Sequence, residues 1–209
     1  MSAKVKPNII IFETLFSMCT WPGNDKLMQE YHDKEWGVPV MDDKTHFEFI
    51  VLECFQAGLS WKTILHRRKG FKKAFANFDH KKVAKFTETD VERLMQDEGI
   101  IRNRLKIQGM IANAKAFSQI QKEFGSFNKY VWTFVNNKPI VNKLKQQNEI
   151  KATSPESDAM ALDMKKRGFK FRGSTICYAN MQAVGMVNDH VQSCKRFKEI
   201  NSLHKDLKI

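Results

Sequence analysis

The chain has 209 residues, of which 42% are hydrophobic and 28% charged, a composition typical of a globular protein with a real hydrophobic core. Its formal net charge of +12 favours a polyanionic partner, most often nucleic acid, although charge alone leaves a ribosomal or membrane-surface role open. Four widely spaced cysteines do not fit a secreted disulfide scaffold and indicate a reducing, intracellular setting. We expect one compact unit.

The N-terminal apolar run, residues 8–12, is too short to span a membrane, and no small-residue cleavage site follows it. We interpret it as part of an extension that folds onto the body or stays loose.

The next informative segment is a helix with Asp42 or Asp43 as its N-cap, running to about Ala57. Apolar residues occupy nearly all of its faces, so we expect it to be buried and to leave Glu53 with little access to water. A buried carboxylate is usually hydrogen-bonded, paired with a cation or reserved for a ligand. The alternative is a glutamate at the solvent edge of a core helix.

Gly58 ends this helix, and Ser60 is a good N-cap for the next, which begins with Trp61 and ends in the basic run 66–69. A carboxylate, an indole and a basic rim therefore lie close together in the chain, which is typical of a binding pocket. Helical spacing and capping residues predict further helices over 71–78, from Thr87 (with Asp90 in a capping box) to about 96, from about 102 to Gly125, over 127–135, from Ser154-Pro155 to Gly168, and over 177–187.

Segment 136–152 is polar and is predicted to be the longest surface loop. No stretch alternates with a period of two for long enough to form a sheet, so the predicted fold class is all-α.

Cys19, His32, His190 and Cys194 supply four ligands of the types that zinc prefers. The second pair would lie one turn apart on one face if that segment is helical. Each pair alone is weak evidence, and the Cys19–His32 pair by itself is better explained by a core cysteine and a capping histidine. Together they predict a closed, structural zinc site that joins the two terminal regions without touching the chemistry.

The segment from Leu94 through Gly99 to Arg102, followed by the long predicted helix, resembles a helix-hairpin-helix element. The amides of its turn would bind a DNA phosphate, helped by Arg102 and Arg104. The usual second glycine is Ile101 here, and an ordinary helical hairpin is the alternative.

Trp21, Tyr31, Trp36 and Trp61 could form stacking surfaces for a base taken out of a duplex. Taken singly, each is more often a core residue. The longest recognisable motifs are Tyr31-His32-Asp33-x-Glu35-Trp36-Gly37, Leu52-Glu53-x-x-Gln56-Ala57-Gly58-Leu59-Ser60-Trp61, Lys166-Arg167-Gly168-Phe169-Lys170-Phe171-x-Gly173, Cys177-Tyr178 and Val187-Asn188-Asp189-His190.

These motifs closely resemble the bacterial 3-methyladenine DNA glycosylase I family, over about residues 19–194. The resemblance implies a helix-hairpin-helix DNA glycosylase-like helical fold, with an N-terminal extension (1–18), a glycosylase domain (19–194) and a basic C-terminal tail (195–209). It implies a DNA repair enzyme that flips 3-methyladenine out of alkylated duplex DNA and hydrolyses its glycosidic bond.

The resemblance also implies residue roles. Structural Zn²⁺ would be bound by Cys19, His32, His190 and Cys194. Glu53 and Tyr31 would hydrogen-bond the base, Trp61 would stack on it, and Trp21 and Trp36 would complete the aromatic wall. DNA contacts would come from Gly58, Leu59, Gly99, Arg102 and Arg104.

Two departures from the family pattern concern the substrate. Met28 stands where the family has a tyrosine, and Cys54-Phe55 replaces a smaller or more polar pair. We expect Met28 to pack on the base through its thioether and Phe55 to affect the substrate range.

The long helix after the hairpin lacks the aspartate that most helix-hairpin-helix glycosylases use, since no aspartate occurs between Asp97 and Asp158. A cationic 3-methyladenine leaves without protonation, so Glu53 is best placed as the catalytic group that favours the cationic base, with water activation as a possible second role.

Two other functions remain open at this point. A non-catalytic reader of alkylated DNA would keep the pocket but release no base, and a structural zinc protein of RNA or the ribosome would need no pocket. For the glycosylase we expect a monomer in the bacterial cytoplasm, associated with the nucleoid and without membrane contact, with double-stranded DNA as partner and free 3-methyladenine as product.

Overall fold

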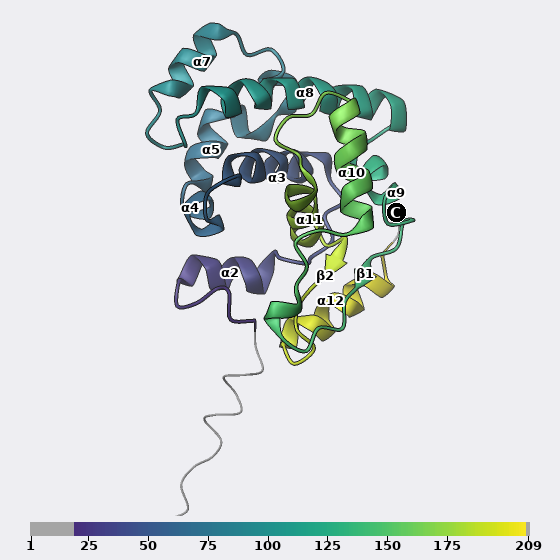
Figure 1. Ribbon diagram of the computed structural model, residues 1–209. Coiled ribbons are helices and arrows are strands. Elements are labelled where there is room, and N and C mark those ends of the chain that lie inside the picture. Colours follow the sequence, from purple (N-terminus) through teal and green to yellow (C-terminus); the bar gives the residue numbers. More distant parts are fainter. Residues whose placement is uncertain (1–18, 208–209) are drawn as a thin grey trace, which may run out of the picture.

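The computed structural model describes residues 19–207, so the expected extension 1–18 lies outside the described residues. Helices dominate this part of the chain (Figure 1). They are α2 (Lys26–Lys34), α3 (Asp43–Gln56), α4 (Trp61–His66), α5 (Arg68–Ala74), α6 (His80–Val83), α7 (Glu88–Met95), α8 (Arg104–Phe124), α9 (Phe127–Thr133), α10 (Pro155–Lys166), α11 (Ser174–Ala183) and α12 (Lys195–Lys205), with short 3-10 turns η1 (Ala76–Phe78) and η2 (Gln147–Glu149).

Local capping signals fix most helix starts. Asp42 caps α3 by accepting from the amide of Thr45, and Ser60 caps α4 by accepting from Thr63. Thr87 and Asp90 form the predicted capping box of α7. These predictions are confirmed because they depend only on residues within one turn of the cap.

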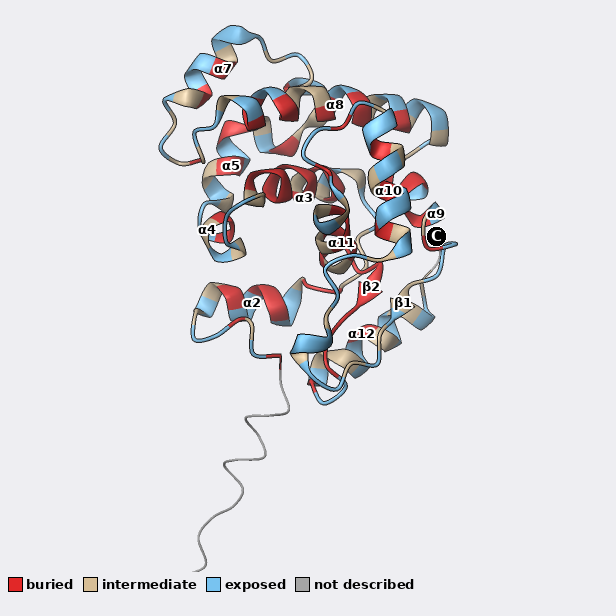
Figure 2. Cartoon of the chain, in the orientation of Figure 1, coloured by how far each residue is buried: buried red, intermediate tan, exposed pale blue. Residues whose placement is uncertain are grey.

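Helix α3 lies at the centre of the molecule and contacts α4, α5, α8, α9 and α11. Figure 2 shows it as the most continuously buried helix of the view. From His46 to Phe55, Glu48 is the one residue that is not buried. The prediction of a core helix around Glu53 is confirmed.

The predicted helix 177–187 is wrong at its C-terminal end. Helix α11 stops at Ala183, and Gly185 adopts a positive φ of 75° where a side-chain carbon would come within 2.4 Å of the Pro39 nitrogen. The chain then enters strand β2 (Val187–Asn188), which pairs in parallel with β1 (Ile140–Val141). The helical framework is as predicted, but the fold also contains this two-stranded sheet.

The other boundaries need smaller corrections. The predicted helix 71–78 is split into α5 and η1, and the long helix begins at Arg104, capped by Asn103, not at Arg102. The predicted loop 136–152 contains β1 and η2.

The predicted basic tail after Cys194 forms α12, which carries the buried Ile200. The side-chain amide of Asn188 in β2 holds this helix by donating to the Phe197 carbonyl oxygen and to the Asn201 side-chain oxygen. Within residues 19–207, no helix is long and apolar enough to cross a membrane.

Candidate active site

A cavity of about 350 Å³ lies between α2, the end of α3, α4 and α11. We call it the aromatic cavity. It brings together all five residues for which the sequence predicted base contacts, and six more that it did not. The predicted residues are Trp21, Tyr31, Trp36, Glu53 and Trp61; the others are Gln56, Gln147, Ile150, Ala179, Gln182 and Ala183.

The aromatic walls are held by contacts between helices. Tyr31 and Trp61 have ring centroids 5.1 Å apart, and Trp21 meets Trp36 at the same separation in an edge-to-face arrangement. Asp25, the N-cap of α2, also accepts from Lys62 and His66 of α4. This link fixes α2, which carries Tyr31, against α4, which begins with Trp61.

Glu53 reaches the cavity from the last turn of α3 and is paired from behind. The Arg172 guanidinium donates to the Glu53 carboxylate over 2.9 Å, and the two side chains are only 1% and 2% exposed. Burial raises the pKa of Glu53 to about 7, although Arg172 acts in the opposite direction. The carboxyl group is therefore poised to change its charge near neutral pH.

Three further groups of the aromatic cavity are donors. Burial, and then the nearby Glu53 carboxylate, raise the pKa of Tyr31 well above its ordinary value, so it stays a neutral phenol. The indole N–H groups of Trp21 and Trp61 are buried and make no hydrogen bond within the described part of the chain. An unpaired buried donor is costly, so a ligand in the cavity would gain from accepting these bonds.

Glutamines line the cavity where the sequence predicted only a surface loop and a core helix. Gln147 accepts through its side-chain oxygen from the backbone amides of Thr20 and Trp21, and so places the Trp21 segment. Gln182 donates to the buried Asp189 over 2.7 Å. Gln147 lies in a polar segment without regular spacing, and no local signal in the sequence marks it as a pocket residue.

The two departures from the family pattern do not line the cavity. Met28 is buried in α2, outside the set of lining residues, and Phe55 packs between Phe71 and Phe75 with ring centroids 4.7 and 5.6 Å away. The prediction that these residues face the base is wrong, because only Tyr31 of α2 and only Glu53 and Gln56 of α3 line the cavity.

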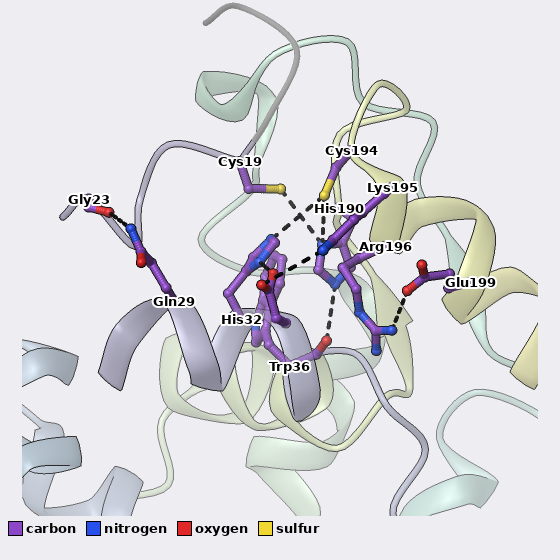
Figure 3. A network of polar contacts seen from close by, with 11 residues as sticks. Cys19, Gly23, Gln29, His32, Trp36, His190, Cys194, Lys195, Arg196 and Glu199 are labelled. Atoms are coloured by element: carbon purple, nitrogen blue, oxygen red, sulfur yellow. Dashed lines mark hydrogen bonds and ion pairs between the residues drawn. The ribbon is translucent and has the colours of Figure 1, made fainter. Parts of the chain in front are cut away.

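The four predicted metal ligands converge beside the cavity, and all of them are buried. We call Cys19, His32, His190 and Cys194 the metal-ligand cluster. Its ligand atoms lie within 4.8 Å of one another, and Figure 3 shows them grouped around a common centre. The His190 Nδ1 is 3.7 Å from both sulfur atoms. Such a set could hold one metal ion.

The sequence pattern placed His190 and Cys194 on one face on the condition that their segment is helical. That segment is a turn, and Cys194 is the residue before α12. Hydrogen bonds from Cys19, His190 and His32 lower the pKa of Cys194, which favours the thiolate that a metal ligand needs. The turn therefore still presents both side chains to the same point.

The cluster also contacts the cavity wall. The Nε2 of His190 is 3.0 Å from the carbonyl oxygen of Trp36, and the His32 and Trp36 rings stack with centroids 6.1 Å apart. The sequence predicted a site that holds the terminal regions together without touching the chemistry. The structure places the cluster directly behind one wall of the aromatic cavity, but none of the four residues lines the cavity itself.

The predicted hairpin packs Gly99 tightly on α5, since a side-chain carbon at Gly70 would lie 2.1 Å from the Gly99 oxygen. The Gly99 amide donates to Asp97. Arg102 is 48% exposed and 3.7 Å from Glu98, whereas Arg104 bridges Glu88 and Glu92 of α7. Of the two predicted phosphate ligands, Arg102 is the freer.

The predicted DNA-contacting turn lies at the end of α3. Gly58 has a φ of 81°, and Leu59 is 42% exposed. The buried Lys106 of α8 donates to the carbonyl oxygens of Phe55 and Ala57. The turn is thus fixed to the helix that follows the hairpin, by a contact that the sequence did not predict.

The basic run after α4 has a structural use. Arg67 donates to the Glu98 carbonyl oxygen, and Arg68 pairs with Glu35 and Glu48. These two arginines hold neighbouring segments together, which the sequence pattern of consecutive basic residues could not distinguish from a phosphate-binding rim.

Comparison with known proteins places this arrangement in a family. The Methyladenine glycosylase family matches residues 21–198. The chain is 51% identical to DNA-3-methyladenine glycosylase 1 of Escherichia coli (strain K12) over 176 residues, covering 84% of this chain and 94% of that protein. It is 44% identical to DNA-3-methyladenine glycosylase of Haemophilus influenzae over 176 residues, covering 84% and 95%.

Solved structures agree with these relatives. A crystal structure of 3-methyladenine DNA glycosylase I has a TM-score of 0.83 and 47% identity, covering 85% of this chain and 98% of that one. The glycosylase I from Staphylococcus aureus, solved to explain 3-methyladenine recognition, has a TM-score of 0.83 and 32% identity, covering 86% and 96%. The chain belongs to the methyladenine glycosylase family.

Proposed function

We infer that this protein is a base-excision repair glycosylase that releases 3-methyladenine from alkylated DNA by hydrolysing the N-glycosidic bond. The observation that carries this inference is the aromatic cavity, in which a buried carboxylate and a neutral phenol face stacking rings. Its volume of about 350 Å³ suits a single base rather than a longer segment of nucleic acid. The target nucleotide has to leave the duplex to enter it.

The chemistry needs no proton donor. Methylation at N3 makes adenine a cation, so the electron pair of the breaking glycosidic bond neutralises the base as it leaves. A water molecule supplies the oxygen that bonds to the sugar carbon, and its surplus proton passes to solvent. Glu53 accepts from the base and stabilises its positive charge, while Trp61 stacks on it and Tyr31 donates.

Selectivity follows from the same groups. Glu53 can accept from the exocyclic amine of 3-methyladenine, but it would face the carbonyl of 7-methylguanine. Two acceptors repel each other, and a buried unpaired acceptor costs about 1–3 kcal/mol. Undamaged adenine, hypoxanthine and uracil are neutral and would need a proton donor to leave, whereas the ionised form of Glu53 that recognises the methylated base is a hydrogen-bond acceptor.

We propose that the metal-ligand cluster binds one structural Zn²⁺. Tetrahedral zinc with ordinary bond lengths separates a sulfur and a nitrogen ligand by about 3.6 Å, and the separations here are 3.7 Å. Four protein ligands leave no open position for substrate, so the ion would stabilise the fold behind Trp36 and take no step in the reaction.

DNA would dock through the turn at Gly58 and Leu59 and through the hairpin at Gly99, Arg102 and Arg104. The exposed Leu59 is suited to fill the gap that an extruded nucleotide leaves.

We propose that the protein acts as a monomer on chromosomal DNA in the bacterial cytoplasm. Met28 and Phe55, the two positions at which the sequence hinted at a non-catalytic reader, lie outside the aromatic cavity.

The test is a release assay on duplex DNA that carries 3-methyladenine, 7-methylguanine, hypoxanthine and uracil, with released bases separated by chromatography. We expect 3-methyladenine to be released and 7-methylguanine, hypoxanthine and uracil to stay in the DNA. Release of hypoxanthine would reveal an acid catalyst, and comparable release of both methylated bases would refute the discriminating role of Glu53. Binding of the lesion without any release would leave a reader.

A further inference from the structure

Arg172 is a cation that lies behind the aromatic cavity. It occupies the unspecified position x in the Lys166-to-Gly173 motif. The Nη1 of Arg172 donates to the Glu53 carboxylate over 2.9 Å, and its Nη2 donates to the Asn180 side-chain oxygen over 2.9 Å. Glu53 lines the aromatic cavity, whereas Arg172 does not. The guanidinium therefore contacts the substrate-facing carboxylate without offering itself to the substrate.

The backbone around Arg172 is built to direct this side chain inward. Phe171 has a positive φ of 57°, which a phenylalanine adopts only where surrounding contacts hold it. Its ring packs on Gly109 of α8, where a side-chain carbon would come within 2.9 Å of it. The buried Asn113 of α8 donates to the Lys170 carbonyl oxygen and accepts from its amide. Helix α8 thus fixes the backbone turn that directs the Arg172 side chain into the core.

We propose that Arg172 is a positioning residue that favours the ionised form of Glu53 and so sets the pH range over which the cavity holds the methylated base. This inference rests on the proposed function, since it concerns the group that recognises the base. Only an ionised carboxylate accepts from the exocyclic amine with both oxygens and balances a cationic base.

The electrostatic argument depends on which groups face Glu53. A carboxylate without a partner at this depth takes up a proton, and a cation within hydrogen-bond distance opposes that uptake. Tyr31 from α2 and Cys177 from α11 face Glu53 as neutral groups, because burial raises the pKa of each. Asn180 of α11 is uncharged, and the indole of Trp61 in α4 does not titrate. Among the described residues, Arg172 is the one cation paired with Glu53.

The protonation equilibrium of Glu53 has its midpoint close to neutral pH even with Arg172 in place, because burial still raises the pKa of Glu53 to about 7. An opposite charge in contact lowers a carboxyl pKa by about 1–3 units. Removing the charge of Arg172 would therefore leave Glu53 mostly protonated at pH 7. Glu53 would then be a neutral carboxylic acid that donates a hydrogen bond at a position where the base needs an acceptor.

The experiment measures affinity for free 3-methyladenine by calorimetry between pH 5.5 and 9. Arg172→Gln removes the charge and keeps a donor to Glu53, and Arg172→Lys keeps the charge. Glu53→Gln is the reference, because the ratio of wild-type to Glu53→Gln affinity cancels the ionisation of the ligand itself. We expect this ratio to rise around pH 7 in the wild type.

In Arg172→Gln we expect the midpoint of the rise to move upward by about 1–3 pH units, with affinity at pH 7 lowered about tenfold or more and recovering toward pH 9. Arg172→Lys should keep a midpoint close to that of the wild type. A loss of affinity in Arg172→Gln that is the same at every pH, or an unchanged midpoint, would overturn the proposal and leave Arg172 a purely structural residue.

Two further results keep the test decisive. If Arg172→Gln does not fold, carbon NMR of the wild-type Glu53 carboxyl, assigned by its loss in Glu53→Gln, replaces it: ionisation below pH 8 supports the proposal, and a carboxyl still protonated at pH 9 overturns it. A wild-type protein that releases no 3-methyladenine from methylated DNA would refute the proposed function and this inference together. Release with an unchanged Arg172→Gln profile would refute this inference alone.

Discussion

The aromatic cavity and the metal-ligand cluster are neighbouring buried polar sites that differ in what their polar atoms face. In the cluster, every ligand atom faces another ligand atom within 4.8 Å. In the cavity, Glu53 is paired on one side only, and two indole N–H groups have no partner within the described residues. A set of polar groups that satisfies itself stabilises a fold, whereas one that leaves groups unpaired has a use for a ligand.

The largest expected effect comes from loss of Cys194, one of the proposed metal ligands. We expect Cys194→Ser to lower the free energy of unfolding by on the order of 4 kcal/mol and to remove the zinc, because structural metal sites contribute directly to folding. Residual glycosylase activity should survive at low temperature. Metal analysis and thermal melting provide the measurements.

The matched control is Cys54→Ser, which makes the same change at a buried cysteine outside the cluster. It should leave the zinc content at about one equivalent. A purified protein without zinc whose melting curve equals that of the zinc-loaded form would remove the distinction between the two sites.

In the aromatic cavity, Glu53→Gln should lower affinity for free 3-methyladenine by roughly 1.5–3 kcal/mol, since it replaces a charge-assisted hydrogen bond by a neutral one. The variant should fold with reduced stability, because Arg172 loses its charged partner in the core. Glu48→Gln is the control, since Glu48 lies on the same helix but pairs with Arg68 outside the cavity. Unchanged base binding by folded Glu53→Gln would refute the role of Glu53.

The buried carboxyl also predicts a pH dependence of stability. The pKa of Glu53 is about 7 in the folded protein, above its ordinary value of 4.5, so the folded state binds this proton more tightly. The resulting stabilisation is complete below about pH 4.5 and is lost as the pH rises through 7. Between pH 5 and 8, the wild type should therefore lose on the order of 2 kcal/mol relative to Glu53→Gln in urea unfolding. Parallel stability curves for the two proteins would contradict the buried ionisation.

The smallest expected effect comes from the hairpin, which belongs to neither site. Arg102→Ala should lower the salt dependence of duplex binding by about one unit of slope, as loss of one phosphate contact does. Arg104→Ala should change it less, because Arg104 is engaged by two glutamates. Neither change should alter affinity for the free base. A double variant that binds duplex DNA like the wild type would show that DNA docks elsewhere.

Sequence patterns predicted the parts of this fold that depend on neighbours in the chain. Asp42, Ser60, Thr87 and Ser154 mark helix starts because a cap involves only the following turn. The pairing of Ile140 with Val187 depends on a contact between distant segments, and two residues are too few to show alternation. The sequence pattern therefore predicts the end of a helix where the structure has strand β2.

The candidate site divides in the same way. The residues assigned to the aromatic cavity and to the metal ligands could be predicted because they stand out by chemical type and by motif. The structure brings each of these two sets together. Arg172 and Gln147 were missed, since an arginine in a basic motif and a glutamine in a polar loop are ordinary surface residues until a partner is known. Conversely, Phe55 lies two residues after Glu53 but points into the core.

The metal-ligand cluster also has a consequence for the topology of the chain. Cys19 and His190, 171 residues apart, are held together there, and every residue that lines the aromatic cavity lies between them. A bound ion would close a loop around the whole cavity, and restraining a loop of this length in the unfolded chain is worth on the order of 5 kcal/mol. During synthesis from the N-terminus, this loop cannot close until Cys194 has been made. We expect the proposed ion to bind only after all of the cavity residues have been synthesised, since they precede His190 and Cys194 in the chain.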